Sequence, residues 1–353
     1  MTNKSHTATE GIRLEAVYQA RTRLQGVAMH TPLQPHPHLS EKYGCEVWLK
    51  REDLQPVRSY KIRGAYNRMA TLTPEQQARG IVCASAGNHA QGVAWACRHL
   101  GIRGKIFMPA VTPNQKVGKV RLFGKEWVEV VLTGDTFDDA YHEALACAKN
   151  EGLAFIHPFD DLRVIEGQAT IALEILDDCE GQPPDLLLLP VGGGGLAAGV
   201  SSVFRQLHPD TTCIGVEPEG APAMHASLKE GRLVTLPQID PFVDGAAVRQ
   251  VGRHTFQICR QTLQEVVTVP EGLVCSVILD LYNEEGIVVE PAGALTLAAL
   301  RLLAPQWQGK KVVCIVSGSN NDITRTEEIK ERALLYEGLK HYFLIRFPQR
   351  AGA

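Results

Sequence analysis

The sequence of 353 residues lacks the features that mark several large classes of protein. It has no long run of one charge, and its formal net charge is only −3, from 36 Lys and Arg against 39 Asp and Glu. A dedicated nucleic-acid binder would carry a basic patch, so this class is not expected. No apolar stretch approaches the roughly 18 residues that a membrane-spanning helix needs, and residues 1–10 lack the apolar core of a signal peptide. We therefore expect a soluble, cytoplasmic protein that binds neither nucleic acid nor membranes.

Cysteine pairs and metal-ligand spacings are also missing. The nine cysteines form no C-x-x-C motif, and an odd number cannot all pair within one chain. Several lie in apolar, strand-like runs, for example Cys83 and Cys314, so buried and reduced thiols are expected. His36 stands between Pro35 and Pro37, and His38 follows Pro37, which favours an extended surface turn, and the spacing predicts no metal site.

The composition is that of an ordinary globular protein, with 44% hydrophobic and 21% charged residues, and the length suggests about two domains. From about residue 46 to residue 321, short apolar runs alternate with stretches typical of helices. The predicted strands are 46–50, 80–84, 105–108, 126–131, 154–156, 185–191, 212–216, 265–269 and 311–316. The predicted helices are 14–24, 62–69, 90–100, 137–150, 166–176, 196–207, 273–285 and 323–338.

Continuous apolar strands that alternate with helices indicate an α/β protein with parallel sheets covered by helices on both faces. Two open, twisted sheets suit the length better than one. After the last helix, residues 339–347 read as a strand and residues 348–352 as a turn. Ligands of such folds bind beyond the carboxyl ends of the strands, so the loops there are the candidates for chemistry.

Four consecutive glycines, Gly192 to Gly195, stand between a very apolar predicted strand and a predicted helix. Glycines let the backbone fold closely around an anion, and the N–H groups of a helix N-terminus then hold a phosphate. The alternative is a tight turn, for which one glycine would suffice. No Walker A lysine follows, and Ala197 breaks a dinucleotide-binding spacing. The segment predicts a phosphate site.

The loop of residues 85–92, Ser-Ala-Gly-Asn-His-Ala-Gln-Gly, also lies between a predicted strand and a predicted helix. Its small and polar residues could bind a carboxylate through backbone donors, with the amide of Asn88 making a specific contact. An ordinary helix cap would explain a Ser or an Asn here, although not the whole set.

A third loop, residues 59–65 with the sequence Ser-Tyr-Lys-Ile-Arg-Gly-Ala, places Lys61 at the start of a predicted helix. Most lysines are solvated surface charges. At this position, the positive end of the helix and partial burial would both favour the neutral amine. A neutral amine is what Schiff-base chemistry requires.

The three loops, in this order, resemble those of the pyridoxal-phosphate enzymes of fold type II, the tryptophan synthase β-like group. Residues 50–53 followed by 59–65 are similar to the cofactor-lysine segment of the threonine and serine dehydratases in that group, and residues 57–61 resemble the biosynthetic threonine dehydratases. Residues 317–322 resemble the loop that meets the pyridine nitrogen, and residues 242–248 and 284–291 extend the likeness, which covers about residues 14–337.

The resemblance implies pyridoxal 5′-phosphate as cofactor, bound in a cleft between two domains, and it implies a role for each matching residue. Lys61 matches the lysine that bonds covalently to the cofactor, Asn88 the partner of its ring oxygen, and Ser317 the partner of its pyridine nitrogen. The phosphate cradle is matched by Gly192, Gly193, Gly194, Gly195 and Leu196. The loop that receives the substrate carboxylate is matched by Ser85, Ala86, Gly87, Asn88 and His89.

One departure concerns a cation. Some serine-acting relatives bind a divalent cation with a Glu and an Asp near a Glu-Pro turn. Here Glu217 and Pro218 are present, but Ala221, Pro222 and Ala223 follow. The acidic partner is missing, so no metal is expected.

The resemblance also implies a domain organisation. Residues 1–52 and 161–335 would form a larger cofactor-binding domain, and residues 53–160 a smaller domain inserted in it. Residues 336–353 look like the entry to an ACT-like regulatory domain that this sequence does not continue, which leaves isoleucine feedback in doubt. Dimers and tetramers are usual in the family, so a homodimer or homotetramer is expected.

The expected activity is the conversion of L-threonine to 2-oxobutanoate and ammonia, a step of isoleucine biosynthesis, with weaker activity on L-serine. A serine dehydratase or a serine racemase of the same fold is the nearest alternative; the missing acidic residue near Ala223 weakly disfavours the racemase. A Rossmann dehydrogenase would have no role for Lys61. A catalytically silent amino-acid sensor is disfavoured because every matched position of the cofactor site is intact.

Overall fold

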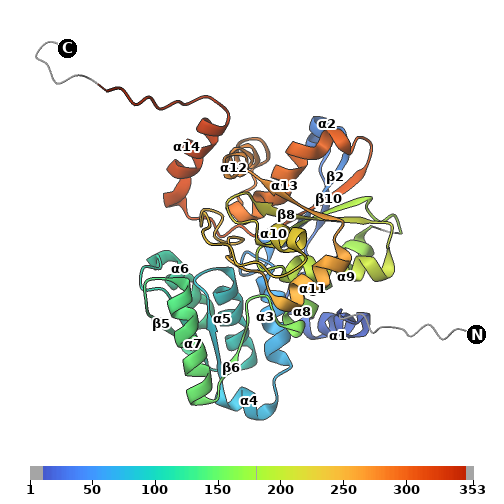
Figure 1. The fold of residues 1–353 in the computed structure, drawn as a ribbon. Coiled ribbons are helices and arrows are strands. Elements are labelled where there is room, and N and C mark those ends of the chain that lie inside the picture. The colour runs from blue at the N-terminus through green and yellow to red at the C-terminus, as the bar shows by residue number, and fades with distance from the viewer. Residues whose placement is uncertain (1–10, 180, 347–353) are drawn as a thin grey trace, which may run out of the picture.

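The computed structural model describes residues 11–179 and 181–346, which form two β-sheets covered by helices (Figure 1). The larger sheet has the strand order β1-β2-β10-β7-β8-β9, and the smaller sheet has the order β5-β4-β3-β6. All neighbouring strands are parallel except β1 and β2. The predicted fold class, α/β with two mostly parallel sheets covered by helices, is confirmed.

The strands of the two sheets come from different parts of the chain. The larger sheet consists of β1 (Leu33–Pro35), β2 (Glu46–Arg51), β7 (Leu186–Pro190), β8 (Thr212–Pro218), β9 (Glu265–Val269) and β10 (Lys311–Val316). The smaller sheet consists of β3 (Ile81–Ala84), β4 (Gly104–Met108), β5 (Val128–Leu132) and β6 (Ala154–Phe155). The smaller sheet is therefore continuous in sequence, whereas the larger sheet joins segments from before and after it.

Helices cover both faces of each sheet. Those beside the larger sheet are α1 (Leu14–Leu24), α2 (Pro37–Tyr43), α8 (Leu162–Asp178), α9 (Gly195–Leu207), α10 (Ala223–Glu230), α11 (Arg253–Thr262), α12 (Glu271–Glu285), α13 (Pro291–Leu303) and α14 (Thr326–Tyr336). The chain around the smaller sheet forms α3 (Lys61–Ala70), α4 (Pro74–Arg79), α5 (Asn88–Leu100), α6 (Asn114–Gly124) and α7 (Phe137–Glu151). Short 3₁₀ turns occur at η1 (Glu52–Leu54), η2 (Lys125–Trp127), η3 (Ala304–Gln306) and η4 (Ile323–Arg325).

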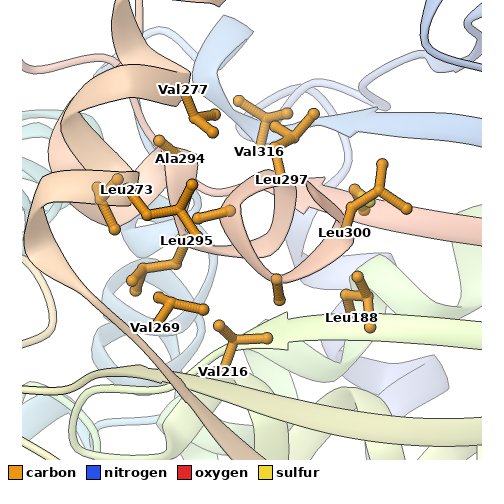
Figure 2. Packing of buried hydrophobic residues seen from close by; sticks show 14 of the residues in the cluster. Leu188, Val216, Val269, Leu273, Val277, Ala294, Leu295, Leu297, Leu300 and Val316 are labelled. Atoms are coloured by element: carbon orange, nitrogen blue, oxygen red, sulfur yellow. The ribbon is translucent and has the colours of Figure 1, made fainter. Parts of the chain in front are cut away.

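The apolar strands explain why both faces are covered. Successive side chains of a strand point to opposite faces, and β7 shows this directly. Leu186 and Leu188 belong to the core under α12 and α13, part of which Figure 2 shows. Leu187 and Leu189 belong to the core under α8 and α9. A strand that is apolar on both sides can be buried only between two layers of helices.

Local sequence signals set several helix boundaries. Asp161 caps α8 by accepting hydrogen bonds from the N–H groups of Arg163 and Val164. Thr73 and Gln76 form a capping box at α4, and Thr136 and Asp139 form another at α7. Such caps satisfy N–H groups that have no partner within the helix, so these helices begin at defined residues.

The structure corrects some predicted elements. Residues 340–346 form neither helix nor strand, so the predicted strand over 339–347 is wrong for these residues, and residues 347–353 lie outside the described part. In Figure 1 the segment after α14 runs away from the rest of the molecule, where no neighbouring strand pairs with it. The extended turn predicted around His36 is in fact the end of β1 and the start of α2, with Pro37 in the first helical turn. The strand β1 was not predicted, and neither were the helices α2, α4, α6, α10, α11 and α13.

Two further expectations can be compared with the described residues. The nine cysteines are all unpaired, and eight of them are buried. Cys83 and Cys314 are fully buried in strands, as predicted. Among residues 11–179 and 181–346, no helix combines the length and the apolar character needed to cross a membrane.

Candidate active site

The predicted site loops all follow the carboxyl ends of parallel strands. The four glycines follow β7, Ser317 follows β10, and Ser85 follows β3. We call the place where these loops meet residues 58–61 the loop junction. Its position is the one that open α/β sheets favour for ligands.

Lys61 is the first residue of α3 and has no carboxylate partner among the described residues. Its Nζ donates a hydrogen bond to the carbonyl oxygen of Pro158 at 2.9 Å and lies 5.4 Å from the centre of the Tyr60 ring. Burial lowers the pKa of Lys61 to about 8, and the charge of Glu290 opposes this shift. A large fraction of the amine is therefore neutral in mildly alkaline solution, as the sequence predicted.

Helix α5 packs directly against this lysine. A Cβ atom at Gly92 would lie only 3.0 Å from the carbonyl oxygen of Lys61. Because real Cβ contacts are rarely so short, a larger residue at position 92 would push α5 away from α3. The loop of residues 85–88, which leads into α5, is thereby held near Lys61.

The glycines Gly192 to Gly195 form a tight turn whose side-chain space is already filled. A Cβ atom at Gly193 would lie 2.2 Å from the Phe159 ring, and one at Gly192 would lie 2.9 Å from the Cα atom of Ala246. Gly194 has φ 93°, which favours glycine. The N–H groups of residues 192–196 have no hydrogen-bond acceptor within the described chain. They form a row of free donors at the N-terminus of α9, which fits a phosphate.

The segment of residues 157–160 connects Lys61 with the four glycines. Pro158 accepts the hydrogen bond from Lys61, and the neighbouring Phe159 contacts Gly193 and Gly195. Asp160 accepts hydrogen bonds from the N–H groups of residues 253–255 at the start of α11. Thr255 in turn donates to the carbonyl oxygen of Gly193 at 2.7 Å. This segment therefore fixes the distance between the amine and the phosphate cradle.

Ser317 lies in the loop after β10, whose backbone contacts residues 59–60, just before Lys61. Its carbonyl oxygen accepts a hydrogen bond from the N–H group of Tyr60 at 3.3 Å, and Ser59 forms a β-bridge with Gly318. The Ser317 side chain is buried, and its hydroxyl donates to the carbonyl oxygen of Ala292 at 3.2 Å. The backbone contacts between residues 317–318 and residues 59–60 thus hold Ser317, with its neutral hydroxyl, beside the loop that carries Lys61.

Asn88 belongs to a closed set of polar contacts. Its Nδ2 donates to Oε1 of Glu290 at 2.6 Å, and its Oδ1 accepts from Nδ2 of Asn320 at 2.7 Å. The N–H group of Asn320 donates to the other oxygen of Glu290 at 3.1 Å. Burial raises the pKa of Glu290 to about 7, and the charge of Asp244 adds to the shift.

The rest of the predicted substrate loop is only half-buried. Ser85, Ala86 and Gly87 are partly exposed, and the Ser85 hydroxyl accepts a hydrogen bond from the N–H group of Gly87 at 3.2 Å. His89 is buried, and its Nε2 lies 3.0 Å from the carbonyl oxygen of Ile156. Burial and the nearby Lys61 lower the pKa of His89 to about 3. His89 is therefore neutral and donates from Nε2.

The structure thus brings the predicted residues together and adds others that sequence reasoning missed. Glu290 and Asn320 lie in segments used for the resemblance, but neither was given a role. A carboxylate next to a proline at the start of an apolar helix was the available signal for Glu290, because such a carboxylate is buried at cost unless it has donors. Phe159 and Asp160 gave no signal, since their contacts lie far away in sequence.

The Glu-Pro turn carries a helix cap. Glu217 is buried, and its two oxygens accept hydrogen bonds from the N–H groups of Met224 and His225, both at 2.8 Å. Burial raises the pKa of Glu217 to about 8. The carboxylate is thus engaged with the start of α10, and residues 221–223 offer it no acidic partner.

Two features lie outside the loop junction. The ligand atoms of His38, Glu284 and Glu285 lie within 4.8 Å of one another on the surface, near Lys42, which pairs with Glu284 at 3.0 Å. The spacing of residues in the sequence did not predict that His38 lies near these carboxylates. A hollow of about 550 Å³ is lined by Gly220 and residues 238–241 and includes none of the predicted site residues.

The residues of the junction fit pyridoxal phosphate. The free N–H groups at residues 192–196 and the glycines without room for a Cβ atom suit a phosphate. The amine of Lys61, with its lowered pKa, suits a covalent bond to an aldehyde. Ser317 offers a hydroxyl, and Asn88 has a second N–H bond that no residue of the described chain accepts.

Comparison with known proteins agrees with this fit. The family described as pyridoxal-phosphate dependent enzyme matches residues 25–318. The chain is 55% identical over 342 residues to the biosynthetic L-threonine dehydratase of Bacillus subtilis, covering 97% of this chain and 81% of that protein. Among solved structures, the processed form of threonine deaminase isoform 2 from Solanum lycopersicum superposes with a TM-score of 0.85 at 40% identity, covering 92% of this chain and 96% of that one. Maize serine racemase gives a TM-score of 0.84 at 26% identity, covering 93% and 99%. The chain belongs to the family of pyridoxal-phosphate dependent enzymes.

Proposed function

We propose that this protein is a threonine ammonia-lyase, which converts L-threonine to 2-oxobutanoate and ammonia with pyridoxal 5′-phosphate as cofactor. The observation that carries the proposal is the meeting of Lys61, the four glycines and Ser317 at one junction, in a chain 55% identical to a biosynthetic L-threonine dehydratase. The reaction first eliminates water from L-threonine, and a water molecule then hydrolyses the remaining C–N bond as ammonia is released. We assign the reaction to isoleucine biosynthesis because of its product, 2-oxobutanoate.

Each residue of the junction has a task in this reaction. Bound pyridoxal phosphate supplies a conjugated ring that withdraws electrons from the α-carbon of an attached amino acid. The N–H groups of residues 192–196 bind the phosphate, and Asn88 binds the ring oxygen. Lys61 would hold the cofactor covalently. Its Nζ, whose pKa burial lowers to about 8, would take the proton from the α-carbon of the substrate.

Ser317 supports elimination over transamination. A carboxylate beside the pyridine nitrogen would keep that nitrogen protonated, whereas a neutral hydroxyl does not. The Ser317 side chain is buried, with the carbonyl oxygen of Ala292 as its hydrogen-bond acceptor. A weaker electron sink favours rapid loss of the β-hydroxyl over long-lived carbanions.

The substrate carboxylate is assigned to the loop of residues 85–89. Its backbone N–H groups lie at the N-terminus of α5, which favours an anion. His89 is neutral, so it adds no positive charge to this loop. The side chains of Ser85 and Asn88 are partly exposed, as a substrate contact requires.

The direct test compares kcat/KM for L-threonine and L-serine and measures D-serine formation with the same preparation. We expect 2-oxobutanoate release, with threonine preferred over serine by about 10- to 200-fold, the range that one methyl group allows. A preference for serine would assign a serine dehydratase, and D-serine formation a racemase. Either result would overturn the proposed substrate.

We also propose the domain division that the resemblance implies, with residues 53–160 inserted between residues 1–52 and 161–335. It is supported by the strand order, because β3 to β6 form their own sheet while β2 and β7 belong to the other. The cofactor would lie between the two domains. Limited proteolysis would test this division.

The proposed assembly rests on the resemblance, and the proposed location rests on the composition of the sequence. We propose a homodimer or homotetramer working in the cytoplasm. Light scattering of the purified protein would test the first, and fractionation of cells the second.

A further inference from the structure

We infer that Glu290 is a positioning residue that fixes the carboxamide of Asn88 in the orientation needed to bind the cofactor. The inference rests on the proposed function for the role of Asn88, and it adds a residue to which neither the resemblance nor the comparisons give a task. Its basis is the set of contacts among Glu290, Asn88 and Asn320.

The first observation is that Glu290 is buried without a cation. Its side chain is 6% exposed, and no Lys, Arg or His forms a salt bridge with it in the described parts of the chain. Its two oxygens instead accept hydrogen bonds from Asn88 and from the N–H group of Asn320. A buried carboxylate without a cation is costly, so packing alone does not explain why a carboxylate stands here.

The second observation is that the donors and acceptors leave Asn88 a single orientation. The Asn320 amide donates both to the carbonyl oxygen of Val57, at 2.9 Å, and to Oδ1 of Asn88, at 2.7 Å. Its Oδ1 accepts from Nζ of Lys119 at 2.9 Å, which fixes the Asn320 amide in turn. The oxygen of Asn88 must therefore face Asn320, and its NH₂ group must face Glu290.

The third observation concerns the remaining N–H bond. An amide NH₂ group has two donors, and Glu290 takes one of them at the short distance of 2.6 Å. The other has no acceptor in the described chain and is the one left for the ring oxygen of the cofactor. Glu290 thus aims the second N–H bond, although it need not touch the cofactor itself.

The fourth observation is that the carboxylate cannot move freely. A Cβ atom at Gly318 would lie 2.5 Å from Oε1 of Glu290, so only glycine leaves space for the carboxylate there. The N–H group of Glu290 donates to the carbonyl oxygen of Gly318 at 3.2 Å. The loop that carries Ser317 therefore also fixes Glu290, and a small shift of either would turn Asn88.

The experiment is a double-mutant cycle on Glu290→Gln and Asn88→Ala. Glutamine keeps the shape of the side chain, but its single oxygen can accept from only one of the two donors. Apoenzyme of the wild type, both single variants and the double variant is titrated with pyridoxal phosphate, and the dissociation constant and the position of the visible absorption band are measured. Glu285→Gln, a change in a carboxylate that is 11% exposed, pairs with His36 and His38 and lies outside the loop junction, is the matched control.

We expect Glu290→Gln to weaken cofactor binding by about tenfold, in the range that loss of one buried partner produces. In the Asn88→Ala background the same change should have less than about a twofold effect, because residues that act through one contact are not additive. The absorption band should shift in Glu290→Gln and Asn88→Ala but not in Glu285→Gln. Equal effects of Glu290→Gln in both backgrounds would overturn the inference, as would an unchanged dissociation constant and band.

Two outcomes are kept apart by this design. If the wild type binds the cofactor but releases no 2-oxobutanoate from L-threonine, the proposed function fails while the cycle still decides the role of Glu290. If Glu290→Gln does not fold, Asn320→Ala takes its place in the same cycle, because it removes the other partner of the same carboxamide. Additive effects for that pair would count against the inference in the same way.

Discussion

The first turn of helix α3 carries two cationic side chains, two residues apart, in opposite electrostatic surroundings. Arg63 is 1% exposed, and its guanidinium contacts Glu52 at 2.8 Å and Glu174 at 2.6 Å. Lys61 has the carbonyl oxygen of Pro158 as its only hydrogen-bond partner among the described residues. The same helix thus presents a fully paired cation on one side and an unpaired amine on the other.

The two pKa values move in opposite directions. Burial opposes the charge of both groups, but the two carboxylates outweigh it at Arg63 and hold its pKa above the usual value. Lys61 lacks such partners, so burial lowers its pKa to about 8. The partners of a buried cation, more than its burial, therefore decide whether it serves the fold or the chemistry. A neighbouring lysine, Lys50, follows the first pattern, since it is fully buried and pairs with Glu174 at 2.7 Å.

The largest effect should come from removing the unpaired amine. Lys61→Ala should abolish the visible band of the covalently held cofactor and lower kcat for L-threonine by at least about 10²- to 10⁴-fold, because the proton-transfer group is gone. Absorption spectra and 2-oxobutanoate release measure both. Lys61→Arg, which keeps a charge but cannot form the bond, should be equally inactive. Near wild-type turnover in Lys61→Ala would remove Lys61 from the mechanism.

Removing the paired cation should damage the fold instead. Arg63→Met leaves Glu52 buried without a cation and leaves Glu174 with Lys50 alone, which should lower the free energy of unfolding by about 3–5 kcal/mol. Urea unfolding followed by circular dichroism measures the loss. Arg21→Met is the control, since Arg21 and Asp177 are 39% and 46% exposed, and such pairs contribute at most about 1 kcal/mol. Equal losses in the two variants would show that the buried network is not special.

The third prediction tests whether the phosphate cradle requires glycines, which have no side chains, at residues 192–195. Gly193→Ala places a Cβ atom against the Phe159 ring, which must move. Because overpacking costs about 1–3 kcal/mol, we expect roughly tenfold weaker binding of pyridoxal phosphate to the apoenzyme. Gly118→Ala, on the exposed side of α6 with no atom near its Cβ position, should leave binding unchanged. Adding Phe159→Ala to Gly193→Ala should restore part of the affinity, and no recovery would place the clash elsewhere.

The smallest effect concerns pH. The neutral amine is the form that attacks an aldehyde, so the rate of covalent cofactor attachment to the apoenzyme should rise with pH around a midpoint near 8. The charge of Glu290 opposes the shift, so Glu290→Gln should move the midpoint lower. In the unfolded chain the lysine keeps its proton up to its ordinary pKa of 10.5. Lys61 therefore contributes stability that grows as pH rises from about 8 to 10.5, and Lys61→Met should remove this part of the slope. A midpoint near 10.5 would contradict the account of the lysine.

The alternation of apolar runs and helical stretches was sufficient to predict the two sheets, and the resemblance supplied candidate site residues in the loops that follow their strands. Apolar strands that alternate with helices specify a parallel sheet, and ligand loops occupy a known edge of it. The contacts of Glu290, Asn320 and Phe159 could not be read in the same way, because they join residues up to 263 positions apart. In the sequence, Lys50 and Arg63 were recognised only as parts of motifs. The carboxylate that both contact, Glu174, lies on α8, more than 100 residues later in the sequence.

The errors have a physical reason as well. Residues 340–346 contain a short apolar run typical of a strand, but a strand needs a paired neighbour, and none is present in the described chain. The strand β1 is only three residues long and contains Pro35, so its pattern is too short to recognise. The strand forms because its backbone pairs with β2, and the side-chain pattern of three residues does not reveal this pairing.

The place of β10 in the larger sheet has a consequence for biosynthesis on the ribosome. β10 pairs with β2 on one side and with β7 on the other, although it follows both in sequence. Until residue 316 has been synthesised, the larger sheet consists of two separate pieces, whereas the smaller sheet can form as soon as residue 155 is available. Folding of chains during synthesis generally proceeds from the N-terminus. Strand β10 therefore joins the two pieces of the larger sheet and also brings Ser317 to Lys61. A nascent chain cannot assemble a complete cofactor site before β10 has paired with β2 and β7.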